Sequence, residues 1–212
     1  MAQAPIQFDR ASGALEGANL WERTAALALV TGSKISSHFS HMGYIACANL
    51  LRKTLPERNI AIRLNPDAVF EFPYGDGYWS KLLNRSYNYE DELEILFADS
   101  IDVDYTLLDC GANYGYWSVL VSSKPYGSHK AIAIEPSGAN FPKLADNARI
   151  NNNRFEVMKC AIGAGRGTAR LSGTKHEAFS IAGAASAGGE EVPVLALDDL
   201  IDDGKIPASG KY

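Results

Sequence analysis

The spacing of apolar and polar residues separates a first half with helix and hairpin patterns from a second half in which strands and helices alternate. Residues 1–19 are mostly small and polar without a period, which predicts a flexible arm. Residues 20–55 favour helix, and Phe39 and Met42 fall on one apolar face of it. Residues 60–72 alternate around a central turn, which predicts a β-hairpin.

The second half carries the pattern of parallel strands joined by helices. Apolar strand candidates occupy residues 105–110, 130–136 and 155–162, and helical patterns lie between them at residues 115–122 and 141–148. Strands separated by helices of this length form right-handed βαβ units. The predicted fold class is therefore α/β, with a doubly wound, mostly parallel sheet. The pattern after residue 163 predicts a hairpin or an edge excursion.

These patterns predict three parts: a flexible arm over 1–19, an N-terminal helical and hairpin cap over 20–100, and the main α/β domain over 101–212. Hydrophobic residues make up 46% of the chain and charged residues 21%, so the chain is expected to fold. The net charge of −5 offers no basic face for a polyanion, and we expect no nucleic-acid partner.

Membrane and compartment expectations follow from the apolar runs and the cysteines. The apolar run from Ala25 to Val30 is far shorter than the roughly 20 residues that a membrane span needs. We therefore expect no membrane partner and no export signal. Three scattered cysteines, Cys47, Cys110 and Cys160, suit neither a disulfide framework nor a closed zinc site, which favours the cytoplasm.

The most informative segment joins the strand at 105–110 to the helix that follows. It reads Asp109-Cys110-Gly111-Ala112-Asn113-Tyr114-Gly115 and lies at the carboxyl end of a strand, where open α/β sheets bind ligands. Gly111 lets the backbone approach a ligand, Gly115 permits close helix packing, and free N–H groups at the helix start are expected to face the ligand. Glu135 ends the next strand, where a carboxylate can accept hydrogen bonds from a ribose diol.

The same segment distinguishes between two cofactors that contain adenosine. The nicotinamide fingerprint G-x-G-x-x-G needs a second glycine where this chain has Asn113, which leaves less room for a pyrophosphate. S-adenosylmethionine has no phosphate and tolerates that difference. The sequence favours S-adenosylmethionine, with a nicotinamide-dependent oxidoreductase as the alternative.

The segments 107–115 and 134–136 resemble the FkbM-type methyltransferases, and 140–147, 160–163 and 192–200 are similar to that family in order and spacing. The resemblance implies a Rossmann-like fold and S-adenosylmethionine-dependent methylation of a hydroxyl on a sugar, glycan or natural product. It places Asp109, Gly111 and Asn113 at the methionine part, Glu135 at the ribose and the backbone of 160–162 at the adenine. The cofactor contacts expected from motif and resemblance together are Asp109, Gly111, Ala112, Asn113, Tyr114, Gly115, Glu135, Pro136 and Ala161.

Members of this family continue into a strand with a Lys-x-Asp-x-Glu-Gly motif, whereas this chain ends at Lys211-Tyr212. The resemblance therefore implies a methyltransferase fold that is incomplete at its C-terminus. A non-catalytic module that keeps the cofactor pocket for assembly is a third candidate function.

Other candidate groups are weaker. His38 and His41 share a predicted helix, and His129 and His176 fall in loops, but each suits an ordinary surface position. The acidic residues at 198–203 suit a solvated helix start, so we expect no metal site. Tyr78 and Trp79 fit either a cap over the acceptor or hairpin packing. The sequence identifies neither a catalytic base nor an oligomeric state.

Overall fold

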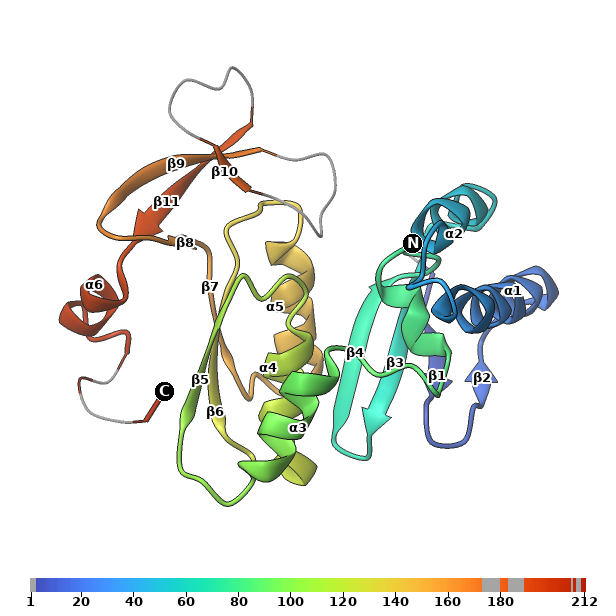
Figure 1. The fold of residues 1–212 in the computed structure, drawn as a ribbon, viewed down its shortest axis with the longest axis horizontal. Helices are drawn as coiled ribbons and strands as arrows, with labels where there is room; N and C mark the ends of the chain where they lie inside the picture. The colour runs from blue at the N-terminus through green and yellow to red at the C-terminus, as the bar shows by residue number, and fades with distance from the viewer. Residues whose placement is uncertain (1–2, 173–179, 183–188, 207, 209–210) are drawn as a thin grey trace. The chain divides into compact units, whose positions relative to one another are not determined.

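The structure is a computed structural model that describes residues 3–172, 180–182, 189–206, 208 and 211–212. The chain forms two compact units, residues 1–96 and residues 97–212 (Figure 1). The sequence predicted a boundary between residues 100 and 101.

The first unit contains a four-stranded sheet in the order β2-β1-β3-β4. Its strands are β1 (Ile6–Asp9), β2 (Leu15–Glu16), β3 (Asn59–Asn65) and β4 (Ala68–Pro73). Strands β3 and β4 are antiparallel, which confirms the predicted hairpin. Ile60, Ile62, Phe70 and Phe72 alternate along them and are each at most 1% exposed, so one face of the hairpin forms the core of the unit.

Strand β1 corrects the prediction of a flexible arm over 1–19. Residues 6–9 pair in parallel with β3, and Ile6 and Phe8 are 0% and 7% exposed. The Arg58 guanidinium donates hydrogen bonds to the carbonyls of Ala4 and Gly17. The prediction of an arm is wrong because Ile6 and Phe8 alternate at the two-residue period of a strand, over a run too short to stand out in the sequence.

Two helices follow β2, namely α1 (Leu20–Ser37) and α2 (Tyr44–Arg52). Helix α1 begins at a capping box, in which Asn19 and Glu22 each accept a hydrogen bond from the other's backbone N–H. Helix α3 (Asp91–Asp99) comes later, after a short 3₁₀ helix at Trp79–Leu83.

The helical stretch predicted over 20–55 is interrupted by a turn at residues 38–43. Ser40 and His41 have positive φ values of 52° and 58°, and Gly43 follows with 77°. These left-handed residues end α1 and reverse the chain. The predicted apolar helix face through Phe39 and Met42 is therefore wrong, since both residues lie in the turn and are 66% and 83% exposed.

The second unit contains an all-parallel three-stranded sheet in the order β5-β6-β7. Its strands are β5 (Thr106–Cys110), β6 (Lys130–Ile134) and β7 (Glu156–Met158), and the helices that connect them are α4 (Tyr116–Val121) and α5 (Phe141–Ile150). A 3₁₀ turn, Lys124–Tyr126, follows α4. This arrangement confirms the predicted alternation of strands and helices.

Residues 155–162 were predicted as one strand, and the structure divides them between two sheets. Strand β7 belongs to the parallel sheet, and β8 (Ala161–Ile162) pairs with β11 in a second sheet of order β10-β9-β11-β8. The other strands of that sheet are β9 (Gly167–Ser172), β10 (Ser180–Ala182) and β11 (Glu190–Leu195). Strands β9 and β11 are antiparallel, as the predicted hairpin requires.

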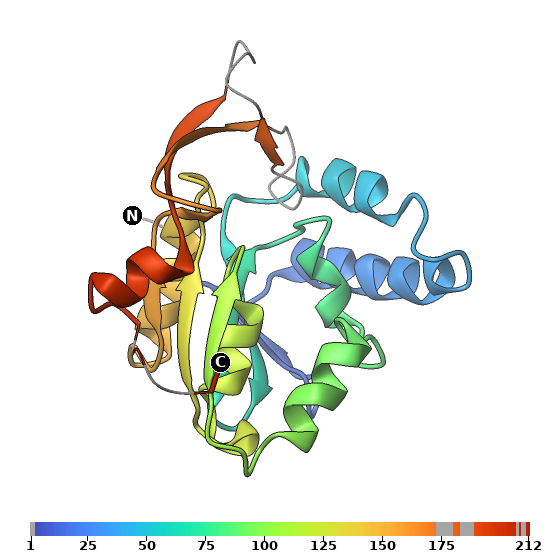
Figure 2. The same cartoon turned by 60° about the vertical axis from the view of Figure 1, so that its left-hand side comes forward.

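Helices lie on both faces of the parallel sheet (Figures 1 and 2). Helices α4 and α5 contact β5, β6 and β7. Helix α6 (Leu197–Asp202) lies on the other side, where Leu200 joins Ile132, Ile134 and Cys160 in a buried cluster. The structure therefore confirms a mixed α/β fold with one all-parallel sheet.

Candidate functional site

The turn after β5 has the backbone geometry that its glycines predict. Gly111, Asn113 and Gly115 have positive φ values of 86°, 54° and 85°. Glycine adopts this left-handed region without strain, and asparagine tolerates it better than most residues. The positive φ values at these three positions therefore explain why they are occupied by glycine and asparagine.

Most N–H groups of this turn are already used within the protein. The N–H groups of Gly111 and Ala112 both donate to the carbonyl of Ile134, at 2.8 and 3.0 Å, and that of Gly115 donates to the carbonyl of Ala112 at 2.7 Å. The N–H of Asn113 donates to the Glu135 carboxylate at 2.8 Å. The turn is therefore fixed by its own hydrogen bonds, and Gly115, the residue before α4, has no free N–H. That free N–H groups at the start of α4 face the ligand stays a prediction.

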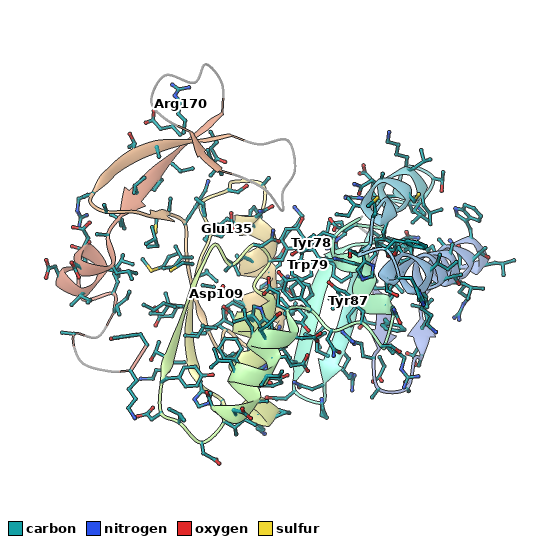
Figure 3. The ribbon with its side chains drawn as sticks, viewed as in Figure 1. Tyr78, Trp79, Tyr87, Asp109, Glu135 and Arg170 are labelled. Atoms are coloured by element: carbon teal, nitrogen blue, oxygen red, sulfur yellow. The ribbon has the colours of Figure 1, made fainter. Side chains whose placement is uncertain are left out.

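Glu135 connects the ends of two neighbouring strands. Its Oε2 accepts the N–H of Asn113 from the turn after β5, and its Oε1 accepts the N–H of Ser137 at 2.9 Å from the loop after β6. The side chain of Asn140 also hydrogen-bonds to it, and the residue is 5% exposed. An ionised carboxylate offers about four acceptor positions, so capacity for a ligand hydroxyl remains. Figure 3 labels both Asp109, near the end of β5, and Glu135, which directly follows β6.

Burial raises the pKa of the Glu135 carboxyl above its ordinary value. The hydrogen bonds from Ser137 and Asn113 act in the opposite direction because they favour the charged form. The negative charge of Asp109 adds to the upward shift. Glu135 is therefore a carboxylate whose ionisation is sensitive to what binds beside it.

The two flanking glycines of the turn differ in what surrounds them. A Cβ atom on Gly111 would meet nothing within 4 Å, whereas one on Gly115 would lie 2.5 Å from Cδ1 of Leu144. Gly115 therefore allows the turn to pack closely on α5, as Leu144 is fully buried. Gly111 instead faces open space, which has room for a ligand group.

Asp109, at the end of β5, is held by α4. The Ser118 hydroxyl donates to Asp109 Oδ2 at 2.7 Å, and Ser118 is 0% exposed. A hydrogen bond from a buried hydroxyl fixes the carboxylate in one orientation. This contact could not be predicted from the sequence, because Ser118 stands nine positions further along the chain on a different element.

Tyr114, the aromatic residue of the predicted site, is buried. It is 2% exposed, and Lys143 Nζ lies 5.5 Å from the centre of its ring. Its carbonyl accepts a hydrogen bond from Asn147 Nδ2 at 2.9 Å. Asn147 is fully buried on α5 and joins Leu144 in supporting the turn. A contact between Tyr114 and a ligand stays a prediction.

The remaining predicted contacts are placed as follows. Pro136 is half-buried beside Glu135, and Cys160 is buried with Ile134 at the end of β6. Ala161 is 4% exposed and pairs with Val194 in the second sheet. The structure therefore brings Cys160 to the end of β6 and assigns Ala161 to the neighbouring sheet, and adenine contacts from this segment stay a prediction.

Glu190, on β11, is a residue that the sequence did not single out. Its carboxylate accepts the N–H of Gly138 at 2.7 Å and pairs with Lys159 Nζ at 3.1 Å. The hydrogen bond from Gly138 is the main reason that its pKa is lowered. Glu190 thus ties the second sheet to the loop after β6, which carries Glu135.

The weaker candidates are not brought together. His38 Nδ1 lies 3.2 Å from the carbonyl of Lys34, and His41 Nδ1 lies 3.1 Å from Ser36 Oγ. His129 stacks on Tyr105 with 4.1 Å between the ring centres, while His176 lies outside the described residues.

The acidic residues near α6 have local partners. Asp199 accepts the N–H of Ala196 at 2.8 Å, and Arg166 pairs with Asp199 and Asp203. Trp79 is buried among aromatic rings, and the Tyr78 hydroxyl lies 3.1 Å from that of Tyr89. Within the part of the chain that the structure describes, no three His, Cys, Asp or Glu residues are placed to hold a metal ion.

Comparison with known families decides the assignment of the second unit. The family model described as the methyltransferase FkbM domain matches residues 109–208. This part of the chain belongs to the FkbM methyltransferase family. No curated protein and no solved structure matches the chain.

The FkbM match begins at Asp109 and includes the glycine turn, Glu135 and the strands from β6 to β11. The family assignment and the geometry therefore concern the same residues.

Proposed function

We propose that this chain is an S-adenosylmethionine-dependent methyltransferase that binds the cofactor at the carboxyl ends of β5 and β6. The observation that carries the proposal is the position of Glu135, whose carboxylate is fixed against the turn after β5 by the N–H of Asn113. A nucleoside whose ribose contacts Glu135 would reach the turn that passes over Gly111. The FkbM family assignment supports the same ligand.

The residues present fit this cofactor. Gly111 faces open space, and a side chain there would fill it. Glu135 would accept hydrogen bonds from the ribose hydroxyls, and Asp109, Gly111 and Asn113 would surround the methionine part. The backbone of 160–162 would contact the adenine. When bound, the cofactor supplies a methyl group on a sulfonium.

The chain's own contribution to transfer is alignment. Orientation of reacting groups can contribute about 7–11 kcal/mol in favourable systems, provided that the site is rigid. The turn meets that requirement, because its N–H groups are bonded, Asn147 holds the carbonyl of Tyr114, and Leu144 packs against Gly115. Ser118 similarly fixes Asp109.

We further propose that the acceptor is a hydroxyl group of a sugar, glycan or natural product and that the parallel sheet is part of a doubly wound, Rossmann-like domain. A hydroxyl acceptor needs its proton removed, but the base need not be strong, since the leaving group is a neutral thioether. The family assignment supports methyl transfer, and the acceptor class rests on the resemblance alone.

The proposal is tested by thermal unfolding with S-adenosylmethionine, S-adenosylhomocysteine or NAD. We expect both adenosyl ligands to raise the unfolding temperature and NAD to leave it unchanged, since Asn113 occupies the second glycine position of the nicotinamide motif. Stabilisation by NAD alone would favour the oxidoreductase.

Transfer itself is measured with a radiolabelled methyl group over a panel of hydroxylated acceptors. Labelled product supports the enzyme. Cofactor binding without transfer to any acceptor would favour the non-catalytic module.

A further inference from the structure

Helix α1 has an apolar face that the fold does not bury. Its buried residues, among them Ala25, Ala26 and Leu29, lie on one side. Leu20, Leu27 and Ile35 are 82%, 67% and 61% exposed. At 3.6 residues per turn these three side chains fall within one sector, directly opposite the buried residues. An amphipathic helix normally presents polar residues there, whereas α1 carries exposed large apolar side chains on the side away from the core.

The exposed apolar residues continue into the turn after α1. Phe39 and Met42 are 66% and 83% exposed, and the left-handed residues Ser40, His41 and Gly43 shape the turn that carries them. Figure 2 shows this turn at the end where α1 and α2 join. We call Leu20, Leu27, Ile35, Phe39 and Met42 the outer surface of α1.

The exposed charges on α1 itself are of one sign. The exposed charged residues on α1 are Arg23 and Lys34, and its one acidic residue is Glu22, whereas Arg52 at the end of α2 pairs with Asp76 at 3.9 Å. Glu22 is 0% exposed and pairs with Arg58 at 3.2 Å. The chain as a whole has 20 basic and 25 acidic residues, so the positive character is local to α1.

We propose that the outer surface of α1 docks on an anionic lipid membrane. Exposed apolar side chains bordered by Lys and Arg are the combination by which helices lie in the interface of anionic bilayers. A second copy of this chain would match the apolar residues but would place like charges against each other.

No membrane partner was expected from the sequence, because its apolar runs are too short to span. Among the described helices, indeed, none has the length and hydropathy of a span. A helix that lies parallel to the membrane surface needs neither that length nor that hydropathy. It needs exposed apolar side chains, and their exposure could not be predicted from the sequence. The proposal is independent of the proposed function.

The test is co-sedimentation of the full chain with phosphatidylcholine vesicles and with vesicles that also contain phosphatidylglycerol. We expect binding to the anionic vesicles, weakened by high salt. The double substitution Phe39→Ser and Met42→Ser should reduce it by roughly tenfold or more, given the transfer free energy of large apolar side chains. Replacing Arg23 and Lys34 by Gln should reduce it by roughly fivefold for each charge.

Matched controls lie elsewhere on the chain. Ile95 is 63% exposed on α3, and Lys205 is exposed after α6, so Ile95→Ser and Lys205→Gln should leave binding unchanged. The proposal would be overturned if the chain bound neutral and anionic vesicles equally or bound neither. It would also be overturned if the control substitutions reduced binding as much as the test substitutions. Sedimentation velocity showing a dimer that the substitutions at Phe39 and Met42 dissociate would overturn it as well.

Discussion

Replacing Gly111 or Gly115 by alanine tests which glycine of the turn after β5 leaves room for the ligand and which one allows close packing. Both residues have nearly the same positive φ, 86° and 85°, so both substitutions carry the same backbone strain of about 1–2 kcal/mol. The surroundings differ, since the new methyl group meets nothing within 4 Å at Gly111 but lies 2.5 Å from Leu144 Cδ1 at Gly115.

The magnitudes follow from that difference. Gly115→Ala adds overpacking of about 1–3 kcal/mol to the strain, for a total loss of stability of about 2–5 kcal/mol. Gly111→Ala should lower the folding stability only by the strain energy. It should nevertheless bind S-adenosylmethionine roughly tenfold or more weakly, because its methyl group enters the space assigned to the cofactor. Urea unfolding measures the loss of stability, and calorimetric titration measures the affinity for S-adenosylmethionine.

A folded Gly111→Ala variant with wild-type affinity would refute the placement of the cofactor over Gly111. Equal loss of stability in the two variants would show instead that Gly115 does not pack on Leu144 as described.

Four further outcomes are expected. Because burial raises the Glu135 pKa, affinity for S-adenosylmethionine should fall as the pH is lowered through that raised value, and titrations of a Glu135→Gln variant should show little of this dependence. The contribution of Glu135 to folding stability should change in the opposite sense in urea titrations, decreasing as the pH rises from 4.5 to the raised pKa, since the folded state holds the proton more tightly. Ser118→Ala should weaken cofactor binding by roughly tenfold, because Asp109 loses a hydrogen bond worth about 1.5–3 kcal/mol, while circular dichroism stays unchanged. Arg58→Met should destabilise the first unit by about 3–5 kcal/mol in urea unfolding, because Glu22 is left buried without its partner, and adding Glu22→Gln should restore much of the loss.

The sequence predicted those elements whose pattern is local and long enough to read. The β3–β4 hairpin and helix α5 repeat their own period over several residues, and strands β5 and β6 are short, largely apolar runs. Strand β1 was missed because Ile6 and Phe8 give only two alternating positions, and their burial depends on pairing with β3. Residues 155–162 were read as one strand because a change of sheet between Met158 and Ala161 leaves no mark in the hydropathy.

Some residues of the candidate site could likewise be predicted from the sequence, and others could not. The glycine turn and Glu135 were predicted because their residue types are required by backbone geometry and ligand chemistry at known points of the fold. Ser118 and Asn147 could not be predicted, since their partners come from other elements. The hydrogen bonds that occupy the N–H groups of Gly111 and Ala112 likewise depend on where the end of β6 lies.

Calorimetric titration of the wild-type chain and of Glu135→Ala with S-adenosylmethionine tests the central claim most directly. We expect one site per wild-type chain, competed by S-adenosylhomocysteine, and binding at least tenfold weaker in the variant, because a charge-assisted hydrogen bond to the ribose is worth about 1.5–3 kcal/mol. Equal affinity in a folded Glu135→Ala variant, or no binding by the wild-type chain, would contradict the account.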